Sequence, residues 1–390
     1  MERSEKVYGL FNDSFPPVLD GVTLTVQNYV RWLTTFGKRT CVVTPWNPVK
    51  PSHDGYALYR YFSLSIASRK PYRYGYPKLD PFIWHKMRTV PFALVHSHCP
   101  FSSGRLALYA ARKQHVPLIA TFHSKYRTDL EHSLPGWMVK RIMSRVMTFF
   151  DAADEVWIPQ AKVEDTVREY GYKGKLTVVE NGIDLEMSDF ASIKAFKAEQ
   201  RLKLGYTPET MVLLFVGQHI REKGVLLIIR AMDKLRDLPV KMEFIGTGYA
   251  TEEMKNLIRQ LHLEDKVTLN GVISDREVLK SYYGAADMFL FPSRYDNAPL
   301  VVREAAMMGT PAVLIAGSTA SEVIKDGFNG FLVEESPESY ASRIRSLYND
   351  RSAIQEAAEG ASKTLTRSWR EVMEEVVGRY EEIIERYGRR

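Results

Sequence analysis

Two carboxylates eight positions apart, Asp296 and Glu304, form the most informative chemical pattern in the sequence. They lie in a strand, loop and helix pattern in which Leu300 and Val301 begin the helix and Glu304 follows within it. A helix N-terminus attracts anions because its first amides have no partner within the helix. A carboxylate such as Glu304 accepts hydrogen bonds from two vicinal hydroxyls, as in ribose. The pattern therefore predicts a site for an anion and for a ribose-like diol.

Two further loops carry groups that suit a diphosphate. Arg221 and Lys223 lie between a predicted strand and a predicted helix, where cations can neutralise an anion. Gly21 begins another helix, whose amides and dipole favour phosphate oxygens. Exposed loop cations and tight turns are common, so solvated charge and a simple turn are the alternative interpretations.

Three histidines end predicted strands. His123 is followed by Ser124-Lys125-Tyr126, which gathers donors suited to a phosphate or a sugar hydroxyl. His96 and His98 share one face of a strand, but a metal site needs a third ligand at suitable spacing. We therefore expect a hydrogen-bonded structural role for His96 and no metal site.

The elements that must position these residues follow a repeated strand, helix, strand pattern in both halves of the chain. This pattern predicts an α/β fold with two tandem Rossmann-like, doubly wound domains, in which ligands bind beyond the carboxyl ends of the strands. We place the domains at residues 1–188 and 189–368. Residues 369–390 keep a helical apolar stripe that must be covered, so this helix is predicted to pack back on the N-terminal domain.

Composition narrows the class of protein. The 390 residues are 45% hydrophobic and 26% charged, as in a globular protein, and no apolar run reaches the roughly 20 residues needed to cross a bilayer. Two cysteines without CxxC spacing argue against a disulfide framework, and the charged N-terminus argues against a signal peptide. Residues 1–150 hold 21 Lys and Arg against 8 Asp and Glu, whereas the remainder hold 32 against 39. The basic half predicts an anionic partner or a phosphate site, and solubility alone is the alternative.

Taken together, these residues resemble the retaining glycosyltransferases of sequence family 4, which have the GT-B architecture of two Rossmann-like domains with a cleft between them. The resemblance covers nearly the whole chain. The motifs that carry it are Asp20-Gly21-Val22, the strand ends at His98 and His123, Glu180-Asn181-Gly182-Ile183-Asp184, Val216-Gly217 with Glu222-Lys223-Gly224, Gly246-Thr247-Gly248, and the acidic pair ending in Glu304.

The resemblance implies a metal-independent enzyme with a nucleotide-sugar donor as co-substrate and no other cofactor. The second domain would hold the donor and the first the acceptor. Glu304 would bind the ribose, Lys223 and the Gly21 amide the diphosphate, and backbone groups near Val272 the base. His123 and Asp296 would lie near the donor sugar, as catalytic residues. Retention in this family is described as front-side attack, with the leaving phosphate taking the acceptor's proton.

Three positions depart from the family pattern. Asp296 replaces the usual Glu, Pro299 replaces a Gly, and Gln218 stands where an Arg often contacts the diphosphate. Arg221 is near enough in sequence to compensate for Gln218. These departures bear on donor choice more than on activity.

Within the family, Asp13–Val22 and Phe122–Tyr126 are most similar to bacterial diacylglycerol glucosyltransferases and phosphatidylinositol mannosyltransferases. We therefore expect UDP-glucose as donor and a membrane lipid as acceptor, with the protein cytoplasmic and peripheral on the inner face of the plasma membrane. Cations interleaved with aromatics in two stretches, 59–62 and 68–78, which include Tyr72, Arg73 and Tyr74, favour a membrane interface, and Tyr126 is a further acceptor or membrane candidate. We expect no nucleic-acid partner, since no motif presents the basic residues to one.

Three alternatives remain at this point. One is a glycosyltransferase for a soluble or polysaccharide acceptor, and another is a catalytically weak nucleotide-sugar-binding protein. A nicotinamide oxidoreductase is the third, although Gly246-Thr247-Gly248 lacks the third Gly of a dinucleotide fingerprint. Residues 139–150 carry an amphipathic helical stripe that is a second candidate for the membrane interface, but such a stripe is more often part of the core, which is what we expect here.

Overall fold

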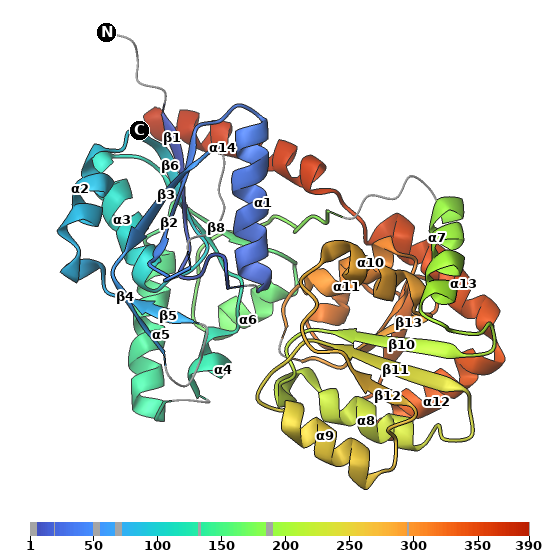
Figure 1. The fold of residues 1–390 in the computed structure, drawn as a ribbon. Helices are drawn as coiled ribbons and strands as arrows, with labels where there is room; N and C mark the ends of the chain where they lie inside the picture. Colours follow the sequence, from blue (N-terminus) through green and yellow to red (C-terminus); the bar gives the residue numbers. More distant parts are fainter. Residues whose placement is uncertain are drawn as a thin grey trace. The chain divides into compact units, whose positions relative to one another are not determined.

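The computed structural model describes residues 6–18, 20–49, 55–66, 72–131, 134–184, 190–294 and 296–389, without the side chain of Asp129. The chain divides into two compact units (Figure 1). Unit 1 comprises Met1–Asn181 and Trp369–Arg390, and unit 2 comprises Gly182–Ser368. The boundary predicted between residues 188 and 189 lies outside the described residues.

Unit 1 is built on a parallel sheet, which within the described residues has seven strands in the order β3-β2-β1-β6-β7-β8-β9. Buried apolar residues dominate β1, β2 and β6, as expected for parallel strands that are covered on both faces. The strands are β1 (Val7–Phe11), β2 (Thr40–Pro45), β3 (Ala57–Tyr61), β6 (Phe92–Ser97), β7 (Leu118–Thr121), β8 (Glu155–Ile158) and β9 (Leu176–Val178).

Helices cover both faces of this sheet (Figure 1). They are α1 (Gly21–Thr35), α2 (Pro81–Thr89), α3 (Ser102–Gln114), α4 (Tyr126–Glu131), α5 (Gly136–Asp151), α6 (Val163–Glu169) and α14 (Trp369–Gly388), with the short η2 (Pro77–Leu79). Two short strands, β4 (Ser63–Ser65) and β5 (Arg73–Gly75), pair antiparallel beside the sheet. The apolar stripe of α5 is buried in the core of unit 1, so the core interpretation of that stripe is confirmed.

The C-terminal helix α14 returns to unit 1, where it packs on α1 and β6 (Figure 1). Its apolar stripe is buried from Trp369 to Ile383. The ring of Tyr380 stacks on Trp157 at 5.6 Å, and its hydroxyl lies 2.6 Å from Nδ1 of His96. This helix therefore completes the core of a unit whose other elements all lie within Met1–Asn181.

Unit 2 is built on a second parallel sheet, with six described strands in the order β12-β11-β10-β13-β14-β15. Its strands are β10 (Met211–Val216), β11 (Val240–Ile245), β12 (Val267–Leu269), β13 (Met288–Phe291), β14 (Ala312–Ile315) and β15 (Gly330–Val333). Its helices are α7 (Phe190–Lys203), η3 (Arg221–Lys223), α8 (Val225–Asp233), α9 (Thr251–Gln260), α10 (Arg276–Ala285), α11 (Leu300–Met307), η4 (Ala320–Val323), α12 (Pro337–Asn349) and α13 (Arg351–Thr364). The two tandem doubly wound sheets that the sequence predicts are thus confirmed.

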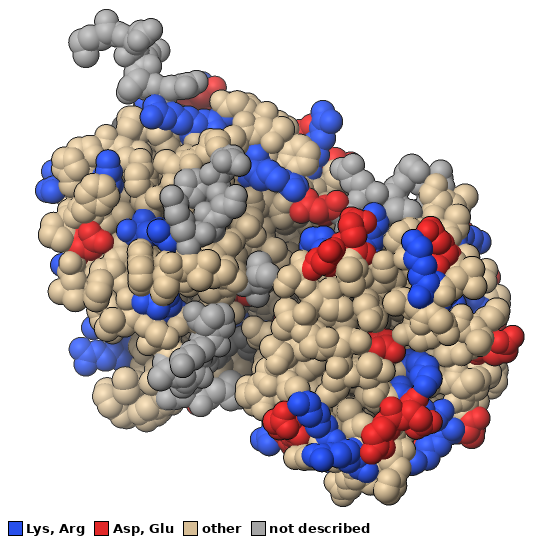
Figure 2. All heavy atoms as spheres, viewed as in Figure 1, with Lys and Arg blue, Asp and Glu red and all other residues tan. Residues whose placement is uncertain are grey.

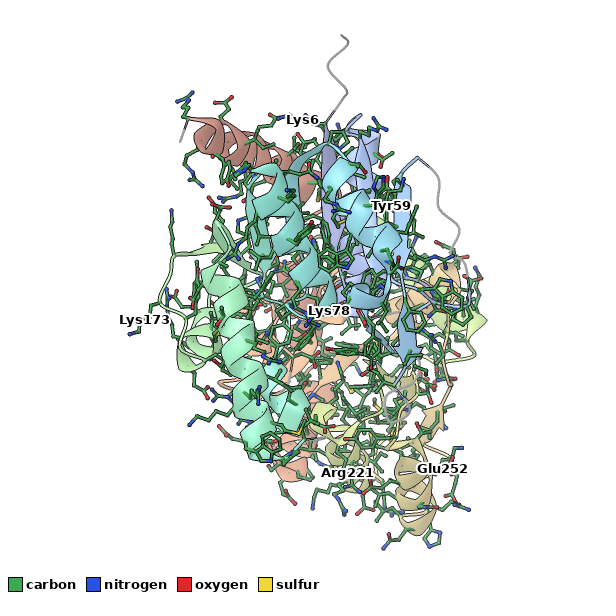
Figure 3. The ribbon with its side chains drawn as sticks, turned by 90° about the vertical axis from the view of Figure 1, so that its left-hand side faces the viewer. Lys6, Tyr59, Lys78, Lys173, Arg221 and Glu252 are labelled. Carbon is green, nitrogen blue, oxygen red and sulfur yellow. The ribbon has the colours of Figure 1, made fainter. Side chains whose placement is uncertain are left out.

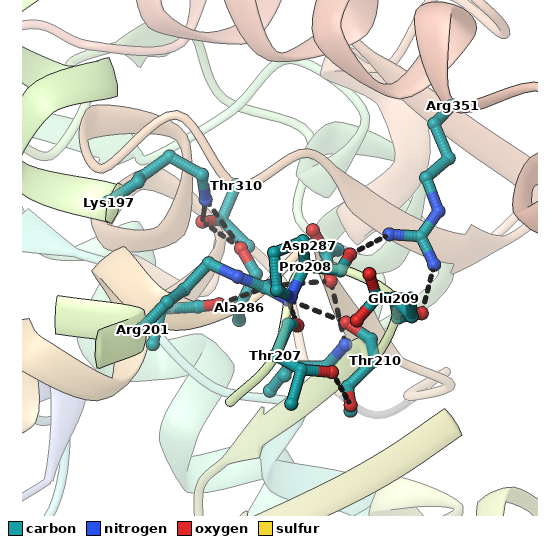
Figure 4. Close-up of polar contacts among 12 residues, drawn as sticks. Lys197, Arg201, Thr207, Pro208, Glu209, Thr210, Ala286, Asp287, Thr310 and Arg351 are labelled. Carbon is teal, nitrogen blue, oxygen red and sulfur yellow. Dashed lines mark hydrogen bonds and ion pairs between the residues drawn. The ribbon is translucent and has the colours of Figure 1, made fainter. Parts of the chain in front are cut away.

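Polar contacts fasten α7 to the amino ends of the unit 2 strands (Figure 4). Lys197 Nζ donates to the carbonyl of Ala286 at 2.5 Å and lies 3.2 Å from Oγ1 of Thr310. Arg201 pairs with Asp287 at 2.9 Å in a largely buried contact. Burial lowers the pKa of Lys197 to about 8. These contacts lie at the opposite end of the strands from their carboxyl ends, where ligands bind in doubly wound sheets.

One residue of a stretch expected at a membrane interface lies in the core instead. The stretch 59–62, expected at a membrane interface, belongs largely to strand β3, and Tyr61 is fully buried. The hydroxyl of Tyr61 donates to Asp13 Oδ1 at 3.1 Å, so this aromatic ring serves the core. Of the second stretch, residues 68–71 lie outside the described residues.

Among the residues that the structure describes, none of the helices combines the length and apolar character that crossing a bilayer requires.

Candidate functional site

Each sheet reverses its strand order at one point, and three of the predicted site residues follow strands that flank these points. In unit 1 the order turns between β1 and β6, and in unit 2 between β10 and β13. Loops from adjacent strands diverge at such a point and leave a crevice at the carboxyl edge of the sheet. Gly21 follows β1, Lys223 follows β10 and Asp296 follows β13.

In unit 2 the structure brings together Lys223 and Asp296, which the sequence separates by 73 residues. Nζ of Lys223 donates to both carboxylate oxygens of Asp296, at 2.8 and 2.9 Å. Ser293 Oγ donates to the same carboxylate at 2.6 Å, and Nζ of Lys223 also lies 5.3 Å from the ring centre of Phe291. Both side chains of the ion pair are largely buried, so the pair is held in one geometry.

Gly224 makes this approach of the two loops possible. Its φ of +68° lies in the left-handed region, and a Cβ built there would lie 2.7 Å from the carbonyl oxygen of Pro292. Any other residue would push the loop after β10 away from β13. The ion pair of Lys223 and Asp296 therefore depends on a glycine at the next position.

The second predicted cation, Arg221, does not share the buried position of Lys223. Its side chain is exposed and its Nε donates to Glu253 on α9 at 2.7 Å. Gln218, at the position where the family often has an Arg, is exposed in the same loop. Arg221 would have to leave Glu253 to replace the missing Arg on a diphosphate.

Glu304 is buried to 7% exposure on α11, and both of its oxygens have partners. Oε1 accepts from Nη2 of Arg276 at 3.0 Å, and Oε2 accepts from the hydroxyl of Tyr283 at 2.9 Å. Burial and the charge of Glu304 raise the pKa of Tyr283 well above its usual value, so the phenol keeps the proton that it donates. The carboxylate is thus fixed in orientation by two residues of α10.

The N-terminus of α11 carries no side-chain cap, since Pro299 precedes it. Leu300 and Val301, its first residues, are partly exposed. The amides at a helix start favour an anion. Val272, predicted to lie near a base, is 62% exposed in the loop after β12. Glu304 therefore lies on a helix whose uncapped N-terminus is suited to an anion.

In unit 1 the loop after β1 is ordered by its own polar side chains. Asp13 accepts from the backbone amides of Ser102 and Ser103, at 3.1 and 2.8 Å, and so holds the start of α3. Asp20 caps α1 by accepting from the amide of Thr23 at 2.7 Å. Gly21 is the first residue of α1, and no atom lies within 4 Å of the position that its Cβ would occupy.

The predicted histidine His123 lies beside His98. Nδ1 of His98 and Nε2 of His123 are 3.0 Å apart, and the two rings are stacked. Burial lowers the pKa of His123 to about 3 and that of His98 well below its usual value. His96 is fully buried, with Tyr380 and Thr121 as hydrogen-bond partners at 2.6 and 2.7 Å, which confirms its structural role.

The four acceptor or membrane candidates of unit 1 do not form one surface. Tyr74 is exposed and packs edge-on against Tyr76, and Tyr72 is partly exposed. Arg73 donates to Ser63 and lies over the ring of Trp46. Tyr126, by contrast, is buried in the aromatic core of unit 1, so its ring is not on the exposed surface.

Within the described ranges, no cluster of three or more His, Cys, Asp or Glu side chains has the arrangement of a metal site.

Sequence reasoning missed Arg276 and Tyr283, the two partners of Glu304. Asp275 caps α10 by accepting from the amides of Glu277 and Val278, and that cap fixes the start of the helix at Arg276. The acidic cap was readable in the sequence, but the contact with Glu304 depends on how α10 packs against α11.

Two families match the chain, one on each half. Residues 19–187 match the family described as Glycosyltransferase Family 4, and residues 196–364 match Glycosyl transferases group 1. Together these matches account for most of the chain and leave α14 outside.

Individual relatives match the chain at low sequence identity. It is 25% identical over 329 residues to an alpha-monoglucosyldiacylglycerol synthase from Streptococcus pneumoniae, covering 83% of this chain and 74% of the relative. It is 30% identical over 284 residues to a D-inositol 3-phosphate glycosyltransferase from Kineococcus radiotolerans, covering 66% and 64%. The solved structure of a sucrose-phosphate synthase from Thermosynechococcus elongatus matches the fold with a TM-score of 0.81 at 18% identity, covering 97% of this chain and 99% of that one.

Proposed function

Because the chain belongs to the group 1 and family 4 glycosyltransferases, a retaining and metal-independent family with the GT-B fold, we propose that it transfers glucose from UDP-glucose to a membrane lipid such as diacylglycerol. The observation that carries the donor half of the proposal is the pair of buried, oriented carboxylates Asp296 and Glu304 beside Lys223. Glycolipid synthesis by the Streptococcus pneumoniae relative supports the acceptor half.

Unit 2 holds the donor in this proposal. Glu304 accepts hydrogen bonds from the ribose hydroxyls, for which Arg276 must release Oε1 while Tyr283 keeps hold of Oε2. The open start of α11 and Lys223 face the diphosphate, and backbone groups near Val272 contact the base. Cationic and dipolar groups that are already in place stabilise the charge that develops on the leaving diphosphate.

Asp296 lies near the donor sugar in this proposal, as does His123 of unit 1. When the diphosphate binds, it competes with Asp296 for Lys223, since both are anionic ligands of one ammonium. Binding of the donor thereby loosens Asp296 toward the sugar. Front-side attack with proton transfer to the leaving phosphate accounts for retention, as in the family.

The surface of unit 1 supports an anionic bilayer as the second partner. Helices α2, α3 and α5 lie side by side, and Figure 3 looks onto the side of unit 1 that carries them. In Figure 2, most charged side chains on the visible face of unit 1 are Lys or Arg, whereas unit 2 shows both signs. The three helices hold eight Lys and Arg and one acidic residue, Asp151: the cations are Lys86, Arg88, Arg105, Arg112, Lys113, Lys140, Arg141 and Arg145. Each basic residue near an anionic membrane contributes about 1 kcal/mol to binding.

Large apolar side chains are exposed near the same helices. Leu79, Phe82 and Trp137 are each more than 60% exposed, on η2, α2 and α5. Aromatic and aliphatic side chains flanked by cations favour the interface between headgroups and acyl chains. We call the eight cations and these three residues the basic face. It is the surface through which unit 1 docks on the cytoplasmic leaflet in this proposal.

A donor screen tests the first half of the proposal. The purified protein is incubated with UDP-, GDP- and ADP-sugars in the presence of EDTA, and thermal stability and nucleotide release are measured. Stabilisation by UDP-glucose with release of UDP on adding dioleoylglycerol vesicles is the expected result. Stabilisation by another nucleotide sugar alone would contradict the donor, and no response to any of them would contradict donor binding.

Vesicle binding tests the second half. Binding should rise with the fraction of phosphatidylglycerol and fall with salt, because screening weakens surface electrostatics. The variant Lys140→Glu/Arg141→Glu should lose binding, whereas Lys173→Glu/Lys175→Glu, with the same charge change in the exposed loop after α6, should bind as the wild type does. Equal loss in both variants would point to net charge alone and contradict docking through the basic face.

A soluble acceptor is the second candidate, because the Kineococcus radiotolerans relative is a D-inositol 3-phosphate glycosyltransferase. Transfer to inositol phosphate in the absence of vesicles would favour it over a lipid. Slow donor hydrolysis without transfer to either acceptor would favour a catalytically weak nucleotide-sugar-binding protein.

A further inference from the structure

The buried side chain next to the candidate catalytic residue His123 has no assigned role. His98 directly follows β6, and its backbone amide donates to the carbonyl of Phe11 at 2.8 Å, which fixes it at the carboxyl edge of the sheet. His123 comes two residues after the adjacent strand β7. The two strand ends place Nδ1 of His98 3.0 Å from Nε2 of His123.

The surroundings of His98 limit it to this one hydrogen bond. The rings of Tyr29 from α1 and His96 from β6 pack around it, with centroids 5.1 and 4.1 Å away. Its other nitrogen, Nε2, is buried and has no hydrogen-bond partner among the described residues. Burial lowers the pKa of both His98 and His123, so both rings are neutral at pH 7.

Two neutral imidazoles joined by one hydrogen bond share a single proton, and burial decides which ring carries it. If Nε2 of His123 carried this proton, His98 would accept at Nδ1 and carry its own proton on Nε2. That N–H would be buried without an acceptor, and orphaned buried N–H groups are rare and costly. If Nδ1 of His98 carries the proton, only a lone pair is left without a partner, and His123 must then be protonated on Nδ1.

We propose that His98 is a positioning residue that donates from Nδ1 to Nε2 of His123, and so presents the Nδ1–H of His123 as a hydrogen-bond donor to the transferred sugar and its phosphate. The inference rests on the proposed function for its ligand, but the tautomer itself is a property of unit 1. A donor at Nδ1 suits hydroxyl and phosphate oxygens, whereas a bare nitrogen there would repel the phosphate.

Nitrogen NMR of the protein labelled with ¹⁵N-histidine tests the tautomer without any ligand, because protonated and bare ring nitrogens have distinct shifts. The chain has nine histidines, and the signals of His123 are identified by their loss in His123→Asn. We expect a protonated Nδ1 on His123 in the wild type and in His98→Asn, whose amide nitrogen takes the place of Nδ1. In His98→Asp, which has the shape of the Asn variant but whose carboxylate can only accept, we expect a proton on Nε2 of His123. A bare Nε2 on His123 in His98→Asp would overturn the proposal.

Kinetics with UDP-glucose separate positioning from packing. His98→Leu should lower kcat/KM, and His98→Asn should restore most of it, while His115→Asn, at an exposed position after α3, serves as the control. In a double-mutant cycle, His98→Leu should have no further effect once His123 is replaced by Asn, a coupling of roughly 3- to 100-fold. Additive losses would overturn the proposal. A wild type without activity on any donor would contradict the proposed function, and the NMR result would still decide the role of His98.

Discussion

The ammonium of Lys223 lies 2.8 and 2.9 Å from the two carboxylate oxygens of Asp296, so a cation suited to a diphosphate is held by a carboxylate suited to a sugar. The two residues follow β10 and β13, the adjacent strands at which the sheet order of unit 2 reverses. Asp is one methylene shorter than the Glu usual in the family, so its carboxylate lies closer to its own backbone. Because each residue of the pair holds the other, mutating them one at a time tests their separate roles.

Replacing Asp296 should separate donor binding from transfer. Asp296→Asn frees Lys223 from its ion pair, so the affinity for UDP should stay equal or increase while transfer falls. Lys223→Gln should instead weaken UDP binding by about 1.5 to 3 kcal/mol, as for lost hydrogen bonds to a charged group. Calorimetric titration with UDP and a transfer assay measure the two effects. Parallel losses of affinity in both variants would contradict the assignment.

Glu304→Ala should weaken nucleotide binding by about 1.5 to 3 kcal/mol, because the ribose loses its charged acceptor. Tyr283→Phe should have a smaller effect, since it removes one orienting hydrogen bond and leaves the carboxylate in place. Glu338→Ala, an exposed glutamate on α12, is the matched control. Titration with UDP and with uridine measures all three. Unchanged affinity in Glu304→Ala would remove the ribose assignment.

Gly224→Ala should destabilise unit 2 and displace Lys223. Gly224 and Gly271 have nearly equal φ values of +68° and +69°, but only at Gly224 would a Cβ meet other atoms within 4 Å. Gly271→Ala should therefore lower the free energy of unfolding by about 1 to 2 kcal/mol through backbone strain. Gly224→Ala should lower it by about 1 to 3 kcal/mol more because of the clash. Urea unfolding measures both. Equal losses of stability in the two variants would show that the close approach to Pro292 does not restrict residue 224.

Acid should destabilise the protein before its carboxylates titrate. Burial lowers the pKa of His219 to about 4, that of His123 to about 3, and those of His96 and His98 well below their usual value. The unfolded chain then binds more protons than the folded one below pH 6.5. The stabilising contribution is complete above pH 6.5 and is lost as the pH falls toward these values.

For His219 the loss should be about 2 kcal/mol at pH 5. The free energy of unfolding, measured by urea between pH 7.5 and 5, should fall less steeply in His219→Gln than in the wild type. Identical slopes would show that His219 titrates normally in the folded state. His262→Gln, at an exposed position after α9, is the control.

The parallel strands of both cores could be predicted from sequence because strands covered on both faces read as continuous apolar runs. Leu213, Phe289 and Val313 are examples, each fully buried. Strand β3, most of whose residues were expected at a membrane interface, is hard to predict because it lies at the edge of its sheet, where Arg60 and partly exposed side chains interrupt the apolar pattern. Edge strands of this kind differ little from loops in composition.

The residues of the candidate site could be predicted from the sequence, but the contacts between them could not. Lys223, Asp296 and Glu304 could be recognised from their loops and from the family resemblance. The hydrogen-bond partners of Glu304 could not be recognised in this way, because its bonds to Arg276 and Tyr283 follow from the packing of α10 against α11. The hydrogen bond between His98 and His123 likewise depends on the alignment of two strand ends 25 residues apart.

The return of α14 to unit 1 sets an order of events during synthesis. Residues 1–181 leave the ribosome without the helix that covers Trp157 and gives His96 its partner Tyr380. The whole of unit 2 is translated in between, and domains fold as units while the chain emerges. Unit 2 can therefore reach its final structure first, whereas the core of unit 1 is completed only after α14 has been synthesised.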